Sequence, residues 1–103
     1  MTIPNDIVTF PDGIVVLGDA TDVDTVTYVR DKVSCVGLIV ADPPYGNIVN
    51  ETWDRIDKDD SQFAEWMVDW TRKWSDGILL DNAAFYVWGG IGMPGFRPFI
   101  RYL

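Results

Sequence analysis

The 103-residue sequence contains no histidine and only one cysteine, Cys35. Without histidine the usual zinc-ligand sets are missing, and so are the Ser-His and Cys-His nucleophile pairs. A general acid or base must therefore be a carboxylate, lysine, tyrosine or cysteine. A single cysteine excludes an internal disulfide and favours a cytoplasmic location. We expect Cys35 itself to be a small buried residue and the chain to bind no metal.

Long apolar runs and positive charge are also scarce. No run approaches the roughly 20 residues that a membrane helix needs, and the first ten residues lack the basic segment of a signal peptide. Sixteen acidic residues against eight basic ones give a net charge of −8, which argues against a large surface for nucleic-acid phosphates. What is present is a chain with 48% hydrophobic residues, which is typical of one small folded domain.

The hydrophobic pattern predicts alternating strands and helices. Strands are expected at 14–17, 36–41 and 84–88, and helices at 23–33, with Asp22 or Asp24 as its cap, and at 61–74. Residues 47–60 are expected to form a loop, and the sequence after 74 and at 81–82 indicates turns. The order β-α-β-loop-α-β predicts an α/β fold with a partial Rossmann-like parallel sheet and right-handed crossovers. Two helices cannot cover both faces of three parallel strands, so a partner chain or further sequence is expected.

The stretch LIVADPPYG, residues 38–46, ends an apolar strand on an unusual turn. Asp42 offers a carboxylate, and Pro43 and Pro44 fix two φ angles and remove two N–H donors, so the turn is rigid and its carbonyls are free to accept hydrogen bonds. Tyr45 adds a flat aromatic face. In an open α/β sheet, ligands bind beyond the carboxyl ends of strands, where this turn is expected. The pattern suits a planar ligand with an NH₂ group, although a plain strand-exit turn would use the same residue types.

The full string, with its neighbours, resembles a known family. DPPY after a hydrophobic strand is similar to the catalytic motif of the amino-group DNA methyltransferases, which methylate adenine N6 or cytosine N4 with S-adenosylmethionine. The segments GDA, VGLIVADPPYGNIVNETWD, FAEWMVDWTRKW and AAFYVWGG occur in the order of that family's N-terminal catalytic half, and the resemblance covers nearly the whole chain.

The resemblance implies a site for a base flipped out of DNA. Asp42 and the carbonyl of Pro43 would accept hydrogen bonds from the exocyclic amine, Pro44 would keep the turn rigid, and Tyr45 would stack on the base. Asp42 and Asp19 are the candidate contacts to S-adenosylmethionine. A carboxylate placed beforehand stabilises the positive charge that develops on the amine. Asp at the first motif position favours adenine N6 over cytosine N4.

One part of the family pattern is absent from the sequence. The Phe-x-Gly-x-Gly cofactor motif is not found, because GGIGMPG at 89–95 follows a different strand and lacks the phenylalanine. We therefore expect residues 1–103 to be a single partial catalytic domain of a larger DNA methyltransferase. Its cofactor glycine motif and target-recognition region would lie downstream, and the isolated chain could be inactive. The expected partners are DNA in the parent enzyme and either a second copy of the chain or the missing C-terminal part.

Weaker signals have two interpretations each. Asp19, after a strand, could contact the cofactor or cap the next helix. The stripe Trp66, Trp70 and Trp74 favours packing against the sheet over a base-stacking platform. Trp53 and Asp54 could close over a ligand or simply pack, and 88–90 could line the pocket. Two other functions stay open: an inactive fragment that binds a partner through an exposed edge or apolar surface, and methyl transfer to RNA or a protein amide.

Overall fold

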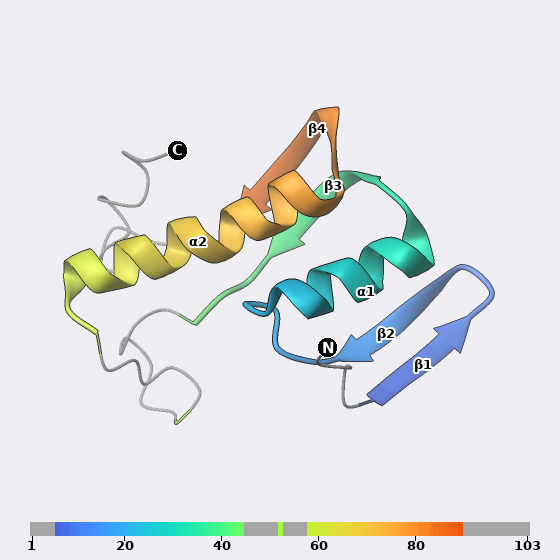
Figure 1. Cartoon of the computed structure of the whole chain (residues 1–103), viewed down its shortest axis with the longest axis horizontal. Helices are drawn as coiled ribbons and strands as arrows, with labels where there is room; N and C mark the ends of the chain where they lie inside the picture. The colour runs from blue at the N-terminus through green and yellow to red at the C-terminus, as the bar shows by residue number, and fades with distance from the viewer. Residues whose placement is uncertain (1–5, 45–51, 53–57, 90–103) are drawn as a thin grey trace.

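The computed structural model describes residues 6–44, 52 and 58–89 of the chain (Figure 1). These residues form a mixed α/β structure with two sheets of two strands each. The elements are β1 (Asp6–Phe10), β2 (Gly13–Leu17), α1 (Val23–Val33), β3 (Val36–Ala41), α2 (Asp60–Ile78) and β4 (Leu79–Val87). The α/β class expected from the sequence is therefore confirmed.

The first predicted strand lies in a hairpin and not in the parallel sheet. It forms most of β2, which pairs antiparallel with β1, and the register places Phe10 opposite Gly13. The residues between them, Pro11 and Asp12, complete the order Pro-Asp-Gly, which is a strong turn signal. The expected sheet of three parallel strands is thus wrong for the described residues, because this turn folds β2 back onto a strand that the sequence analysis did not identify.

The other two predicted strands do pair in parallel. Ile39 lies opposite Phe85 and Ala41 opposite Val87, and the N–H of Trp88 extends the ladder by donating to the Ala41 carbonyl at 2.9 Å. The register shifts between the pairs Val36–Leu79 and Leu38–Ala84, because β4 has more residues than β3 between these two pairs. The turn predicted at 81–82 lies inside β4, in this irregular part of the pairing.

Both predicted helices are present. Asp22 caps α1 by accepting a hydrogen bond from the Asp24 N–H at 2.9 Å, as expected. Helix α2 begins with a reciprocal cap, in which Asp59 accepts from the Gln62 N–H at 2.8 Å and Gln62 accepts from the Asp59 N–H at 3.0 Å. Because this cap precedes the expected start at 61, α2 begins a residue earlier.

Helix α2 also continues past its expected end at 74, through Ser75, Asp76 and Gly77 to Ile78. The reason for the glycine is packing. A Cβ added to Gly77 would lie 2.6 Å from Cγ1 of Val26, so the glycine lets α1 and α2 approach closely without ending the helix. The sequence predicts that Ser75, Asp76 and Gly77 end or interrupt the helix. This is wrong, because a glycine that serves packing looks the same in sequence as one that serves a C-cap.

The core is the face of α2 that lies on β3 and β4. Phe63, Ala64, Met67 and Trp70 are buried and pack against partly buried residues of both strands, Ala41, Phe85 and Val87. The ring centroids of Trp70 and Phe85 are 6.2 Å apart. The helix thus covers one face of the parallel pair.

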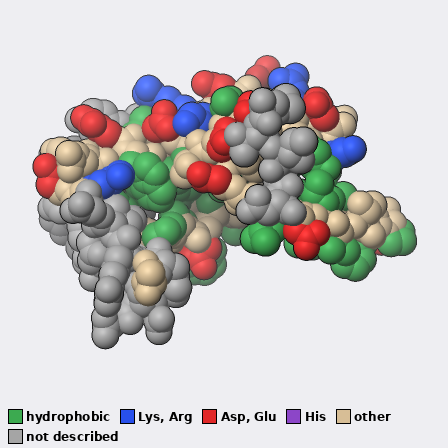
Figure 2. Space-filling view, turned by 60° about the horizontal axis from the view of Figure 1, so that its bottom comes forward, with side chains coloured by type: hydrophobic (Ala, Val, Ile, Leu, Met, Phe, Trp, Pro, Cys, Tyr) green, Lys and Arg blue, Asp and Glu red, His purple; other side chains and the backbone are tan. Residues whose placement is uncertain are grey.

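The opposite faces are apolar and exposed. On β3 and β4 the exposed side chains are Leu38, Val40, Tyr86 and, just after the strand, Trp88; on the hairpin they are Val8, Phe10, Val15 and Leu17. Figure 2 shows hydrophobic side chains gathered at the right-hand end, where the hairpin lies. Cys35 is exposed as well, so the expectation that it is buried is wrong; it directly precedes β3, outside the core. Neither helix of the described ranges has the length and apolarity needed to cross a membrane.

Candidate ligand-binding cleft

A cleft of about 550 Å³ lies where β2 and β3 end. In Figure 1 the arrowheads of β2, β3 and β4 point to the same side. The carboxyl ends of the three strands therefore lie toward the same edge of the structure. The residues that line the cleft come from the β2 exit, β3 and its exit, α2 and β4: Gly18, Asp19, Ala20, Thr21, Ile39, Val40, Ala41, Asp42, Pro43, Pro44, Trp66, Trp70, Trp74 and Phe85.

The Asp-Pro-Pro segment lies in the wall of this cleft. Asp42 is exposed, and Pro43 and Pro44 are half-buried directly after the last residue of β3, Ala41. Their two rings fix the backbone φ angles and leave no N–H to compete for acceptors. The predicted site residues Asp42, Pro43 and Pro44 are therefore brought together at one cleft. Tyr45, the fourth, lies outside the described residues, as do Trp53 and Asp54.

Asp19 is brought to the same cleft from the β2 exit. Its Oδ1 accepts hydrogen bonds from the Thr21 hydroxyl at 2.7 Å and from the Thr21 N–H at 2.9 Å. These bonds, the hydroxyl one first, hold the pKa of the Asp19 carboxyl below its ordinary value of 3.8, with a smaller contribution from the charge of Lys73 and against a small desolvation effect. The alternative that Asp19 caps α1 is wrong, since Asp22 occupies the cap position.

An aromatic wall faces the two acidic segments. Trp66, Trp70 and Trp74 all line the cleft, and the centroids of Trp66 and Trp70 lie 6.3 Å apart in an edge-to-face arrangement. Trp70 is 5% exposed, which confirms the prediction that the stripe packs as core at this position. Among the residues that the structure describes, its buried indole Nε1 has no hydrogen-bond partner. The same stripe is thus both core and cleft wall.

The charge of the cleft has one sign. Its lining includes two carboxylates, those of Asp19 and Asp42, and no lysine or arginine among the residues that the structure describes. Carboxylates and aromatic faces together favour a ligand with positive charge, N–H donors and a flat ring. A phosphate-rich ligand would be repelled at this point.

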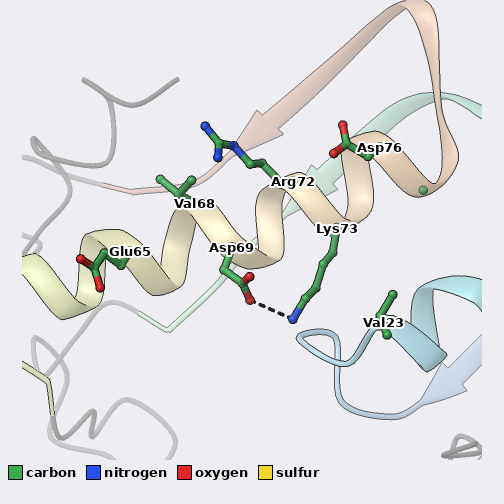
Figure 3. Close-up of a pocket in the computed structure, with 8 residues that line it drawn as sticks. Val23, Glu65, Val68, Asp69, Arg72, Lys73 and Asp76 are labelled. Atoms are coloured by element: carbon green, nitrogen blue, oxygen red, sulfur yellow. Dashed lines mark ion pairs between the residues drawn. The ribbon is translucent and has the colours of Figure 1, made fainter.

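A second, wider hollow of about 640 Å³ lies on the other side of α2 and reaches the start of α1 (Figure 3). Its lining contains the acidic residues Glu65, Asp69 and Asp76 and the basic residues Arg72 and Lys73. Lys73 and Asp69 form an ion pair at 2.8 Å in this lining. It contains none of the predicted site residues. We regard it as a solvated helix face, and the smaller cleft as the candidate site.

Metal ligands and the remaining predicted residues do not add to the cleft. Within the described ranges no three acidic or cysteine side chains are grouped so that they could hold a metal ion. Trp88 is 63% exposed and is not part of the cleft lining, and neither is Gly89. The expectation that this strand end lines the pocket is therefore not supported for these two residues; Gly90 lies outside the described part of the chain.

Sequence reasoning missed two side chains of the site, Thr21 and Phe85. Thr21 follows Asp19 by two residues, and Asp-x-Thr is a common local hydrogen-bonding pattern that could have indicated it. Phe85 and Val87 lie on either side of the exposed Tyr86 on β4, so the period of two along a strand indicates that both point inward.

No protein-family model, curated protein or solved structure matches the chain.

Proposed function

We propose that this chain provides the base-binding side of an S-adenosylmethionine-dependent methyltransferase that acts on the exocyclic amine of a DNA base, with adenine N6 favoured. The observation that carries the proposal is the position of Asp42, Pro43 and Pro44. They follow a strand of a parallel pair, in the wall of an aromatic, acidic cleft that also contains Asp19. The resemblance of DPPY to the amino-group methyltransferase motif is the reason for proposing the exocyclic amine of a DNA base as the methyl acceptor.

The acceptor amine is the group that Asp42 and Pro43 suit. The Asp42 carboxylate and the Pro43 carbonyl accept one N–H each, which fixes the plane of the amine and directs the nitrogen lone pair away from them. The nitrogen would form a bond to the methyl carbon as the carbon–sulfur bond of the donor breaks and leaves a neutral thioether. The nitrogen gains positive charge in this step, and the carboxylate stabilises that charge more than it stabilises the neutral ground state. The methylated amine then loses one proton to solvent. Pro44 contributes rigidity, because it limits the backbone motion that would blur this geometry.

The methyl donor fits the charge of the cleft. S-adenosylmethionine supplies an electrophilic methyl group on a sulfonium and carries a purine ring, and the cleft offers two carboxylates and three tryptophans. Asp19, whose pKa is lowered by the hydrogen bonds from Thr21, would accept hydrogen bonds from hydroxyl or amine groups of the donor. Asp42 lies on the same cleft and would be shared between donor and base.

The proposal includes a Rossmann-like arrangement of the parent domain and a cytoplasmic location. The parallel pair β3–β4, with α2 packed on one of its faces, supports the first. Contacts to DNA phosphates would come mainly from other parts of the enzyme, since this chain carries a net charge of −8.

The test is transfer of a labelled methyl group from S-adenosylmethionine to unmethylated DNA by the wild-type chain, the Asp42→Asn variant and the Asp12→Asn variant. We expect Asp42→Asn to lower the rate by about 10²- to 10³-fold, the usual loss when one group that stabilises transition-state charge is removed. Asp12 is an exposed acid in the β1–β2 turn, so its variant is matched in chemistry and should keep the rate. Equal rates for Asp42→Asn and Asp12→Asn would contradict the role proposed for Asp42. No transfer by the wild type would show that residues 1–103 do not catalyse the reaction by themselves.

The acceptor is decided in the same assay. Single-stranded RNA and a glutamine-containing peptide replace DNA at equal concentration, with mass spectrometry of the digested product. We expect N6-methyladenine from DNA as the main product. If RNA or the peptide amide is methylated instead, the role proposed for Asp42 stands, and the substrate of the enzyme is RNA or a protein amide.

A second candidate function, partner binding without catalysis, is favoured by one observation. The outer face of the β3–β4 pair exposes Leu38, Val40, Tyr86 and Trp88, a larger cluster of apolar side chains than a solvated sheet face usually carries. Sedimentation of the wild type and of Leu38→Lys, a change outside the cleft lining, checks it: a complex that the lysine abolishes, together with no methyl transfer, would favour this function.

A further inference from the structure

The β2 exit segment, Gly18–Thr21, is fastened to α2 by two side chains. The indole N–H of Trp74 donates to the Ala20 carbonyl at 2.7 Å, and the Lys73 ammonium donates to the Thr21 carbonyl at 2.9 Å. These bonds join residues more than fifty positions apart in the sequence. Figure 3 shows Lys73 extending from α2 toward the chain that precedes α1.

The shape of this segment is set locally, but its position is not. Thr21 donates twice to Asp19 Oδ1, and the Asp22 N–H donates to the Asp19 carbonyl at 3.1 Å, so the turn holds its own form. Gly18, Asp19 and Ala20 are nevertheless exposed, which means that little packing places the turn. The bonds from α2 supply that placement.

Lys73 is also held in position by a second interaction, with a residue of its own helix. Its ammonium pairs with Asp69 one helical turn earlier, at 2.8 Å. It lines the wider hollow and not the Asp42 cleft, so it can influence a ligand of the cleft only through Thr21 or through its charge. Trp74, in contrast, is both a wall of the cleft and a donor to the segment.

We propose that Trp74 and Lys73 are positioning residues, which fix the Gly18–Thr21 segment as one wall of the cleft and so set where Asp19 meets the methyl donor. This inference rests on the proposed function. Because the two bonds go to backbone carbonyls, they constrain the path of the chain whatever side chains it carries. Losing either bond lets the Asp19 turn move as a unit away from α2.

The first test is titration of the full chain with S-adenosylmethionine. Trp74→Phe keeps an aromatic wall and removes the N–H, and Lys73→Met keeps the stem and removes the ammonium. We expect each to weaken donor binding by about 3- to 10-fold, the equivalent of one hydrogen bond. Removing the positive charge of Lys73 would by itself strengthen binding of a cationic donor, so weaker binding by Lys73→Met identifies positioning.

The matched control is Trp88→Phe, the same chemical change at an exposed tryptophan outside the cleft lining. It should leave donor affinity unchanged. Unchanged affinity in both Trp74→Phe and Lys73→Met would overturn the inference. Thermal unfolding of each variant separates lost affinity from lost folding.

A double-mutant cycle asks whether Trp74 acts through Asp19. In an Asp19→Asn background the Trp74→Phe change should cost clearly less donor affinity than in the wild type, since the group that it positions is altered. Simple addition of the two effects would mean that Trp74 acts by direct contact or by general stability, and would overturn its positioning function.

A readout without ligand distinguishes failure of this inference from failure of the proposed function. Hydrogen exchange of the Thr21 amide, which donates to Asp19, should become severalfold faster in Trp74→Phe and Lys73→Met but not in Trp88→Phe. If the wild type binds no donor, the donor contact proposed for Asp19 fails and the donor role given to Trp74 fails with it, while the exchange rates show whether the α2 bonds hold the segment. If the wild type binds donor and exchange is unchanged in both variants, the inference alone fails.

Discussion

The two strand-exit segments that meet at the cleft are held by different means. The β3 exit, Asp42–Pro44, is constrained covalently by two proline rings, whereas the β2 exit, Gly18–Thr21, is constrained by hydrogen bonds. In the β2 exit the carbonyls of Ala20 and Thr21 already accept bonds from α2. Proline rings fix the backbone without such partners, so the rigidity of the β3 exit does not depend on bonds from α2.

Under the proposed function, this difference suits the two segments to different tasks. A turn whose backbone is fixed by proline rings suits an amine that must be held in one orientation for reaction. A turn held by hydrogen bonds to a helix can be repositioned when that helix or its partners change, which suits binding and release of a donor.

Trp70→Ala removes the buried surface that both segments share. Trp70 is 5% exposed, packs on Phe85 and lines the cleft beside both exits. We expect the free energy of unfolding to fall by about 3–5 kcal/mol, the usual cost of truncating a buried tryptophan. Urea denaturation checks this value.

The control for that variant is Trp88→Ala. Trp88 is 63% exposed, and its backbone N–H, which bonds to Ala41, is kept in alanine. Its truncation should cost no more than about 0.5 kcal/mol. A cost for Trp70→Ala as small as that of Trp88→Ala would mean that α2 does not anchor the cleft.

Gly77→Ala changes the contact between α2 and α1, the helix that follows the β2 exit. The added Cβ would meet Val26 Cγ1 at 2.6 Å, and Val26 is 2% exposed, so it has little room to move. Overpacking of this kind costs about 1–3 kcal/mol, offset by up to about 1 kcal/mol of helix propensity. We expect a net loss of stability in thermal or urea unfolding.

A second change shows whether the clash is the cause. Val26→Ala removes the methyl groups that the new Cβ meets, so Gly77→Ala should be neutral or stabilising in that background. The same loss in both backgrounds would contradict the packing explanation.

The sequence predicted the β3 exit better than the β2 exit, and the reason is the kind of constraint. Proline acts through its own ring, so Asp42, Pro43 and Pro44 could be read as a rigid turn at a strand end without knowing any neighbour. The β2 exit depends on Trp74 and Lys73, whose sequence distance from Ala20 and Thr21 gives no local signal. Its partners could only be found in the structure.

The fold shows the same division. The helix periodicity of α2 and the apolar run of β3 are local patterns, and both elements were predicted. The prediction that β2 belongs to the parallel sheet is wrong. The Pro11–Asp12 turn pairs β2 with β1 instead, although this turn is also a local signal. The continuation of α2 through Gly77 could not be predicted, because it depends on a contact with Val26.

Pro44→Ala tests the covalent constraint. Alanine can adopt the backbone angles of proline, so the main change is greater freedom of the unfolded chain, worth about 0.4–1 kcal/mol of stability. This loss should be the same from pH 3 to pH 7, since no titrating group is removed. A loss that varies over this range would show that the β3 exit is also held by charge.

Asp19→Asn tests the hydrogen-bonded constraint, and its effect depends on pH. Thr21 lowers the Asp19 pKa below 3.8 in the folded chain, so folding favours the ionised carboxylate. That stabilisation is complete above the unfolded pKa and is lost as pH falls through the lowered folded pKa. Asp19→Asn should therefore be slightly less stable than the wild type at pH 7, and the difference should shrink below about pH 4. Urea denaturation at a series of pH values, beside Pro44→Ala, measures it. Thr21→Val, which removes the largest cause of the shift, should flatten the dependence, and a difference that widens in acid would show that the β2 exit is not held through this carboxylate.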